Sequence, residues 1–247
     1  MWSSKELLLD TLQSNNGEDR FEDLSKDINF EKFTTSRAGA IIVSNEKEGE
    51  IPIIRTTTSY KEPSQPFLQV HYDLVQEIKN VTKNFNINFN NGMVEIYGSE
   101  YTNMKFHSDQ ALDFVPGSYI CLFSCYKNKL EQYPRTLVIK DKISKEITEL
   151  TLEQNSIILF STFDNEKFLH KIVSLNKKTR TVWLGITFRL SKTFIFFKNE
   201  IPYFVKNEKK LIFANDIDKM EFYKFKKLEN DNIGFSYPEI FYTLSQH

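Results

Sequence analysis

The hydrophobic pattern changes along the chain, and these changes divide it into segments. Between residues 67 and 84 the apolar side chains recur at roughly helical spacing, which predicts an amphipathic helix. From residue 85 the chain breaks into short runs rich in β-branched and aromatic residues, separated by polar turns. This regular series of short strands favours an antiparallel sandwich or barrel over alternating strands and helices.

Two segments ahead of residue 67 have patterns of their own. Residues 1–16 combine a capping-box spacing, from Ser3 to Glu6, with leucines that form an apolar side, which predicts a short helix. Residues 17–35 are polar and predict irregular structure. The run 51–60 is rich in β-branched residues and predicts a strand.

The end of the chain differs again from the strand series. Residues 214–230 predict a helix that begins at Asn215 or Asp216 and has basic residues toward its end. No repeat or linker divides the chain, so we expect a single domain. Its expected parts are an N-terminal helical and irregular extension over 1–50, a β core over 51–190, and a β and helical extension over 191–247.

The composition is typical of a folded, aromatic-rich protein. Of 247 residues 40% are hydrophobic, with 22 Phe and 11 Tyr, whereas Gly and Pro number only 8 and 7. The formal net charge of -1 means that any nucleic-acid partner would need a local basic patch. The chain has no run of 18 apolar residues and no GxGxxG or P-loop motif, which argues against membrane spans and nucleotide-cofactor folds.

Both cysteines lie in one apolar run. On a strand, Cys121 and Cys125 would share a face about 13 Å apart, at roughly 3.3 Å per residue, which is too far for a disulfide. We therefore expect buried free thiols, which are typical of a reducing compartment. The predicted location is intracellular, in the cytoplasm or the nucleus.

Metal-binding chemistry is indicated by two of the four histidines. His107 and Asp109 form an HxD tripeptide, and on a strand residues i and i+2 point to the same side. His170 lies 61 residues after Asp109, at the start of another β run, where a barrel can return the chain to the same end. Three such ligands occupy one face of an octahedron and leave three positions open, which suits iron(II) with a co-substrate and oxygen.

A second signal is the alternation within residues 181–189. The even-numbered residues are apolar, whereas the odd-numbered ones include a Gly, a Trp, two Thr and Arg189. The odd-numbered side therefore predicts the lining of a cavity. An Arg at the base of a cavity can clamp a carboxylate through two parallel hydrogen bonds.

Together these motifs resemble the AlkB-like branch of the iron(II)/2-oxoglutarate dioxygenases. The family pattern is HxD, a later His and then R-x-N-x-T-x-R, and this chain has His107-x-Asp109, His170 and Thr187-x-Arg189. The resemblance covers roughly residues 50–190. It implies a mainly β fold with flanking helices around a double-stranded β-helix, or jelly-roll, core.

The resemblance also implies a role for each matched residue. His107, Asp109 and His170 would hold iron(II), with 2-oxoglutarate and O2 as co-substrates. Arg189 would clamp the far carboxylate of 2-oxoglutarate, with Thr187 beside it. The implied reaction is hydroxylation of a C–H bond, and the net result is demethylation where that carbon is an N-methyl group.

Further contacts follow from the same resemblance. Tyr97 lies in a segment that resembles the family's Asn-x-Tyr element and would donate a hydrogen bond to the co-substrate. The run 51–60 lies where the family carries a lid over the substrate. The candidate substrate contacts are Arg55 and Tyr60 in that run, and Trp183.

The substrate class stays open at this point. Basic clusters at 177–180, 206–210 and 224–227 have the charge to bind phosphates, but they are also typical of solvated surfaces. A nucleic-acid base and a protein side chain both fit the implied chemistry, and a small molecule does so as well. The sequence predicts no oligomeric state.

Departures from the family pattern keep other functions open. Trp183 and Gly185 stand where the family has its first Arg and its Asn. One alternative is therefore a barrel that binds metal for sensing or structure without turnover. Another is a cupin-like metal isomerase or hydrolase, which needs a further ligand, and His71 is the only other internal histidine.

Overall fold

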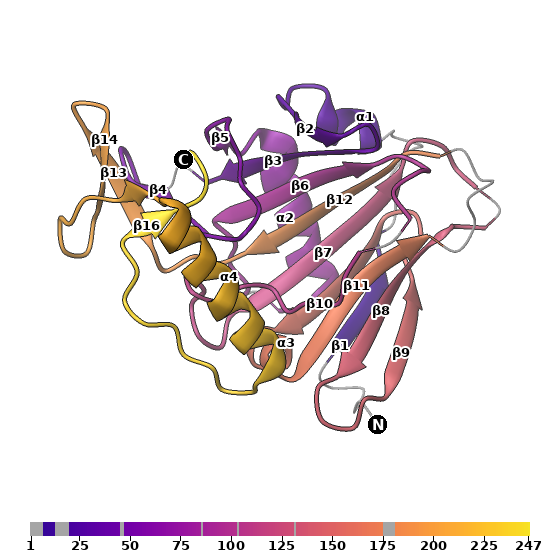
Figure 1. The fold of residues 1–247 in the computed structure, drawn as a ribbon. Helices are drawn as coiled ribbons and strands as arrows, with labels where there is room; N and C mark the ends of the chain where they lie inside the picture. Colours follow the sequence, from indigo (N-terminus) through magenta and orange to yellow (C-terminus); the bar gives the residue numbers. More distant parts are fainter. Residues whose placement is uncertain are drawn as a thin grey trace.

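Two mainly antiparallel sheets face each other in the protein (Figure 1), and the larger one has eight strands. The protein is seen here as a computed structural model that describes residues 7–12, 20–44, 47–84, 86–102, 104–130, 132–174 and 181–247. The predicted fold class is confirmed, since helices flank a β core of the jelly-roll type. None of the helices in these described ranges is both long and apolar enough to cross a membrane.

The order of the strands brings distant parts of the sequence together. The larger sheet runs β1 (Leu7–Thr11), β10 (Ser156–Ser161), β7 (Tyr119–Tyr126), β12 (Trp183–Arg189), β6 (Asn91–Tyr97), β3 (Arg37–Val43) and β2 (Glu31–Thr34), with β5 (Gln65–Pro66) beside β3. The facing sheet runs β11 (Phe168–Ser174), β8 (Arg135–Asp141) and β9 (Ile147–Thr151). Two small sheets consist of β14 (Ile201–Phe204), β13 (Phe194–Lys198) and β4 (Ile51–Pro52), and of β15 (Ile212–Phe213) and β16 (Tyr242–Thr243).

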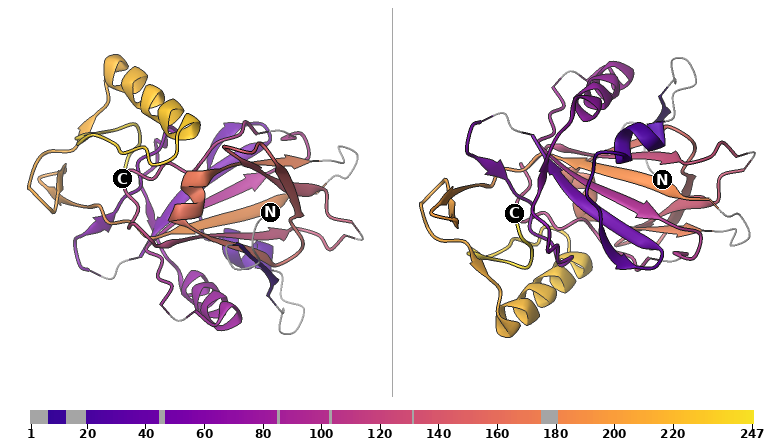
Figure 2. Two further views of the ribbon diagram at one scale, coloured as in Figure 1. Left: turned by 90° about the horizontal axis from the view of Figure 1, so that it is seen from below. Right: turned by 90° about the horizontal axis from the view of Figure 1, so that it is seen from above.

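Four helices complete the described structure, and the two long ones lie on opposite sides of the β core (Figure 2). They are α1 (Arg20–Ser25), α2 (Gln69–Thr82), α3 (Thr162–Lys167) and α4 (Asp216–Asp231). The predicted helices over 67–84 and 214–230 are confirmed as α2 and α4. Helix α4 begins at the predicted cap, because the Asn215 side chain accepts hydrogen bonds from the backbone amides of Ile217 and Asp218.

The larger sheet separates two apolar cores, because its strands send alternate side chains to opposite faces. On β12, Leu184 and Phe188 pack in the outer core against α1 and α2, whereas Trp183 packs between the two sheets. The predicted two-sided pattern of this strand is confirmed. Cys121 and Cys125 both lie buried in the outer core, also as predicted.

Three local predictions are wrong. Residues 7–11 form strand β1, not part of a helix, because their backbone pairs with the edge of β10 and a short helix is only marginally stable in isolation. The rest of the segment 1–16, apart from residue 12, lies outside the described residues. Residues 17–35, predicted to be irregular, include helix α1 and strand β2.

Only Ile51–Pro52 of the predicted strand 51–60 is a strand. Ile53 N still donates to the Thr193 carbonyl oxygen at 2.9 Å, but farther along several backbone amides donate to side chains. Arg55 N donates to Asp113 Oδ2 at 2.7 Å, and Thr57 N donates to Gln110 Oε1 at 2.6 Å. These bonds hold residues 53–60 as an ordered loop at the end of the barrel.

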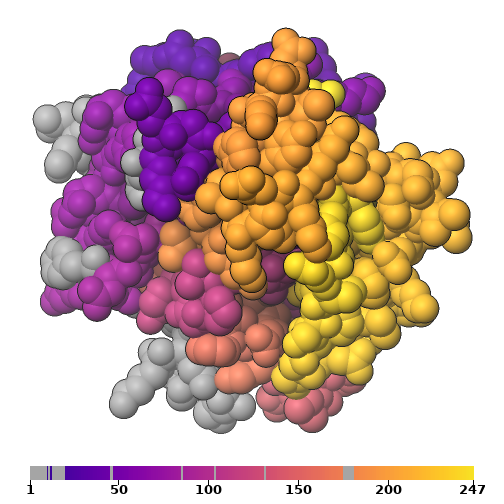
Figure 3. Space-filling view, turned by 90° about the vertical axis from the view of Figure 1, so that its left-hand side faces the viewer, coloured from indigo at the N-terminus to yellow at the C-terminus, as the bar shows by residue number. Residues whose placement is uncertain are grey.

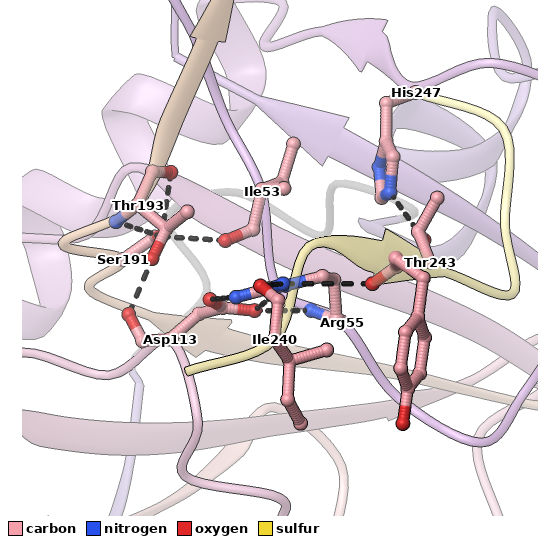
Figure 4. Close-up of polar contacts among 9 residues, drawn as sticks. Ile53, Arg55, Asp113, Ser191, Thr193, Ile240, Thr243 and His247 are labelled. Carbon is pink, nitrogen blue, oxygen red and sulfur yellow. Dashed lines mark hydrogen bonds and ion pairs between the residues drawn. The ribbon is translucent and has the colours of Figure 1, made fainter. Parts of the chain in front are cut away.

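A buried ion pair ties this loop to the C-terminal segment, as Figure 4 shows. The guanidinium of Arg55 bonds to both carboxylate oxygens of Asp113, at 2.7 and 3.1 Å. Its Nη1 donates to the carbonyl oxygen of Ile240 at 2.6 Å. Figure 3 shows the outer face of this region, where the β13–β14 hairpin (orange) and the C-terminal segment (yellow) are packed together. The C-terminal extension is therefore built into the fold.

The first turn of α2 is capped by a histidine, and this predicts a pH-dependent stability. His71 Nδ1 accepts a hydrogen bond from Leu68 N at 2.9 Å, and burial lowers the pKa of His71 to about 4. An unfolded histidine titrates near pH 6.5, so the unfolded state takes up the proton first as the pH falls. The free energy of unfolding is expected to drop by about 2 kcal/mol from pH 7 to pH 5 through His71 alone.

The test is urea unfolding of the wild type and of His71→Asn at both pH values. Asn keeps a hydrogen-bond acceptor for the cap but does not titrate. Between pH 7 and pH 5, the free energy of unfolding of the variant should fall by about 2 kcal/mol less than that of the wild type. An equal loss in both proteins would contradict the assignment.

Candidate metal centre

Two of the candidate ligands face each other across a pair of antiparallel segments. His107 forms an isolated β-bridge with His170 of β11, and their backbones exchange hydrogen bonds of 3.0 and 2.7 Å. The imidazole ring centroids lie 4.6 Å apart. Because the bridge fixes both backbones, the two rings are held on the same side of the facing sheet.

The third candidate, Asp109, lies in a loop and not on the strand that the HxD spacing predicts. Asn165 of α3 holds Asp109 there, because its side chain forms two hydrogen bonds to the Asp109 backbone, as a neighbouring strand would. The Asn165 side chain accepts a bond from Asp109 N at 2.8 Å and donates one to Asp109 O at 2.7 Å. Ser108 is fixed from both sides, by Phe168 O and by the side chain of Asn230 in α4. The position of the carboxylate therefore depends on two helices.

The three side chains converge closely enough to share a metal ion. One ligand atom each of His107, Asp109 and His170 lies within 4.8 Å of the other two, and the described residues hold no other such group of three. Two imidazoles and one carboxylate are the donor set of facial iron(II) sites, which keep open positions for co-substrates. The residues therefore fit the metal that their sequence pattern implies.

The protonation states of the histidines suit metal binding. Burial lowers the pKa of His107, and it lowers that of His170 to about 3, so both imidazoles are neutral at pH 7. His107 Nδ1 lies 3.0 Å from the Lys105 carbonyl oxygen, which assigns the proton to Nδ1. The lone pair of Nε2 is then available to a metal, and the bond to Lys105 fixes the ring orientation.

Arg189 lies directly against the carboxylate of Asp109. Its Nε and Nη2 both contact Asp109 Oδ2, at 3.0 and 2.9 Å. Burial opposes ionisation of Asp109, but the charge of Arg189 outweighs it and holds the pKa of this carboxyl below its ordinary value. The structure thus places Arg189 at the metal end of the site.

Two cavities meet at these residues. One, of about 80 Å³, lies toward the loops and α4. It is lined by Arg37, Thr56, Thr57, Thr58, Met93, Glu95, Met104, His107, Ser108, Asp109, Gln110, Arg189 and Lys226. The other, of about 40 Å³, lies between the sheets and includes His170 and Thr187 with apolar neighbours such as Leu122 and Phe160. Since one water needs about 10–15 Å³ measured this way, the inner cavity holds only a few waters.

The two departures from the family motif form one packed unit. The Trp183 indole lies along its own strand over Gly185, so that a Cβ at position 185 would come 2.0 Å from Trp183 Cη2. The ring stacks on Tyr97 at 4.9 Å between centroids, and its Nε1 donates to Ser124. Arg135 lies over the same indole, with 5.7 Å from its Cζ to the ring centroid. Trp183 is fully buried and lines neither cavity.

The Tyr97 hydroxyl, like the Trp183 indole, is engaged in contacts within the fold. It donates to Glu95 Oε2 at 2.6 Å, and burial raises its pKa well above the ordinary value. Glu95 is paired in turn with Arg37, at 2.6 Å. Glu95 and Arg37 both line the outer cavity, whereas Tyr97 lies behind them.

The two candidate substrate contacts in the loop after β4 lie away from both cavities. Arg55 is buried in its ion pair with Asp113. Tyr60 is 3% exposed and packs edge-on against Phe33 at 5.1 Å. Their neighbours Thr56, Thr57 and Thr58 line the outer cavity instead.

Comparison with known proteins supports the fold and adds no sequence family. No family model matches the chain, and neither does any curated protein. Among solved structures, the chain is similar in fold to OsALKBH1, with a TM-score of 0.51 and 12% sequence identity, over 76% of this chain and 100% of that one. At that identity the likeness shows a shared fold.

Several residues at the site have no signal in the sequence that identifies them. Asn165 and Asn230 hold the HxD loop through single side chains from helices that lie 56 and 122 positions away. Lys226 belongs to a basic run, 224–227, that has the pattern of a solvated helix end, yet it lines the outer cavity. Only its placement distinguishes it from its neighbours.

Metal binding should stabilise the folded protein through these three ligands. Mn(II) at about 100 times its dissociation constant is expected to add about 2.7 kcal/mol, because it binds the folded state preferentially. The measurement is the rise in Tm with added Mn(II). His170→Ala should abolish the rise, whereas His247→Ala, at a histidine outside the group, should keep it. An equal rise in both variants would place the ion elsewhere.

Gly185 and Trp183 should be energetically coupled. Gly185→Ala is expected to destabilise the fold by about 1–3 kcal/mol, since the new Cβ overlaps the indole. Starting from Trp183→Leu, which removes the ring, the same substitution should cost much less. Urea unfolding of the four proteins measures the coupling, and additive effects would contradict the packing described above.

Proposed function

We propose that this protein is an iron(II)- and 2-oxoglutarate-dependent oxygenase. The observation that carries the proposal is the convergence of His107, Asp109 and His170 within 4.8 Å at the end of a jelly-roll core. The fold shared with OsALKBH1 supports it. Iron(II) held by such a donor set supplies oxygen activation coupled to oxidation of 2-oxoglutarate to succinate and carbon dioxide.

The chain's own residues would orient the ligands and control water. His107 Nδ1 donates to Lys105, which leaves Nε2 directed to the ion. Arg189, at the rim of the ion site, would hold Asp109 and pair with a carboxylate that approaches the ion. The apolar lining of the inner cavity, which includes Met93, Met104 and Phe160, would exclude bulk water from the reacting atoms.

The proposed reaction is hydroxylation or oxidative demethylation. His107 and Asp109, which would hold the ion, line the outer cavity, and the loop over 56–58 and helix α4 border this cavity, where a substrate would bind. A nucleic-acid base or a protein side chain is the proposed substrate class, because each presents a single group that a cavity of this kind can admit.

A second candidate function has one observation in its favour. Trp183 and Tyr97 stack on each other and leave the inner cavity at about 40 Å³. A jelly roll that binds metal for sensing or structure, without turnover, is consistent with this packing. Tight metal binding without measurable affinity for 2-oxoglutarate would favour this second function.

The test of the proposed function is succinate formation. Purified protein with iron(II), 2-oxoglutarate and oxygen is expected to form succinate slowly even without its substrate. A variant with His107→Ala and Asp109→Ala should form none, because two of the three ligands are gone. Chromatographic quantification of succinate gives the measurement. Wild-type formation no faster than that of the double variant would reject turnover.

A further inference from the structure

A lysine from the C-terminal helix lines the cavity that holds the metal ligands. Lys226 lies on α4 and is half-buried. Its Nζ donates to the hydroxyl oxygen of Thr57 at 2.7 Å. Within the described part of the chain, no carboxylate lies within ion-pair distance, 4.0 Å, of this ammonium. A cation in such a position is ready to accept an anionic ligand.

The other charges that line the cavity are already paired. Arg189 contacts Asp109 at 2.9 Å, and Arg37 contacts Glu95 at 2.6 Å. Among the described residues of this lining, Lys226 is therefore the cation that has no carboxylate within ion-pair distance, and the charges of Asp109 and Glu229 act on it only from farther away. A bound divalent ion would add further positive charge, so the loaded site calls for an anion.

Two further polar groups share the cavity with Lys226. The Thr57 hydroxyl contacts the ammonium. Gln110 is 4% exposed and also lines the cavity, and its Oε1 accepts from Thr57 N. Gln110 therefore orients Thr57, and its own Nε2 is buried next to Tyr237. The Lys226 ammonium has N–H donors beyond the one given to Thr57, and together with the Thr57 hydroxyl they can satisfy the two oxygens of a carboxylate.

The inner cavity between the sheets is lined, among the residues described, by no cationic side chain that could bind a carboxylate. The residues that line the inner cavity include no Lys or Arg, and Glu95 is its one acidic residue besides Asp109. At the start of β12, where the family pattern has its first Arg, the Trp183 ring fills the space between the sheets. An anionic group placed there would meet apolar side chains and a carboxylate, which disfavours it.

Helix α4 contacts the loop around Asp109, and these contacts explain how Lys226 reaches the cavity. Glu229 and Asn230, three and four residues farther along, share its side of the helix. Glu229 Oε1 accepts from Ala111 N at 2.9 Å, and Asn230 Oδ1 accepts from Ser108 N at 2.8 Å. The helix face that holds the loop around Asp109 therefore also presents Lys226.

We propose that Lys226, with the Thr57 hydroxyl beside it, forms the subsite for the far carboxylate of the 2-oxo acid co-substrate. The inference rests on the proposed function and adds to it that the C-terminal helix, and not a barrel strand, recognises the dicarboxylate. Arg189 then acts at the metal end, next to Asp109.

The experiment compares two co-substrate analogues in two proteins by calorimetry. Mn(II)-loaded wild type and Lys226→Met are titrated with 2-oxoglutarate and with 2-oxopentanoate, which has a methyl group in place of the far carboxylate. Loss of the charged partner should weaken 2-oxoglutarate binding by about tenfold or more. Binding of 2-oxopentanoate should change little, and the variant should no longer prefer 2-oxoglutarate.

Controls separate this subsite from general effects of the substitution. Lys227→Met, at an exposed lysine of the same helix, should bind both compounds like the wild type. Lys226→Arg should keep part of the preference for 2-oxoglutarate. Unchanged Mn(II) affinity in Lys226→Met would show that the metal site is intact.

The outcomes that overturn the proposal differ from those that overturn the function. If the wild type binds and oxidises 2-oxoglutarate while Lys226→Met binds it equally well, only the subsite is wrong. Equal weakening of both compounds in Lys226→Met would also reject the subsite. If the wild type binds Mn(II) but neither compound, the proposed function fails and the subsite fails with it.

Discussion

The buried carboxylate of Asp109 determines how the rest of the site is arranged. Its side chain is 8% exposed, and an ionised carboxylate in such surroundings is costly unless other groups compensate its charge. Arg189 supplies that compensation from the last position of β12, and Asn165 fixes the backbone on both sides of the residue. Since Arg189 already occupies Oδ2, the free energy of metal binding includes that of sharing Asp109 between the ion and the guanidinium.

Strand β12 combines packing and chemistry at alternate positions of one face. At its start, Trp183 fills the interior and Gly185 makes room for the ring, which contributes apolar burial to the core between the sheets. Farther along, Thr187 lines the inner cavity and Arg189 reaches the metal ligand. The aromatic packing leaves little polar space between the sheets, whereas the loop over 56–58 and α4 contribute polar groups to the lining of the outer cavity.

The C-terminal extension is part of the site because of a second buried ion pair. Arg55 and Asp113 lie at 5% and 0% side-chain exposure, and Arg55 also binds the Ile240 carbonyl. This network anchors the chain that follows α4, while Glu229 and Asn230 anchor the helix itself to the HxD loop. Arg55 therefore stabilises the arrangement that brings Lys226 into the cavity, and its predicted role as a substrate contact has no support in its position.

Local patterns determined those parts of the protein that depend on neighbours along the chain. Period-two alternation predicted the two faces of β12 and helical spacing predicted α2 and α4, because these periods follow from backbone geometry. The HxD spacing and a later His predicted the three candidate ligands His107, Asp109 and His170, which the structure brings within 4.8 Å of one another. Only the tertiary structure decided that β1 is a strand at the edge of β10, that Arg189 pairs with Asp109, and that Lys226 lines the cavity that holds His107 and Asp109. Such pairings join residues far apart in sequence, so they depend on how the sheets and helices pack and on no local period.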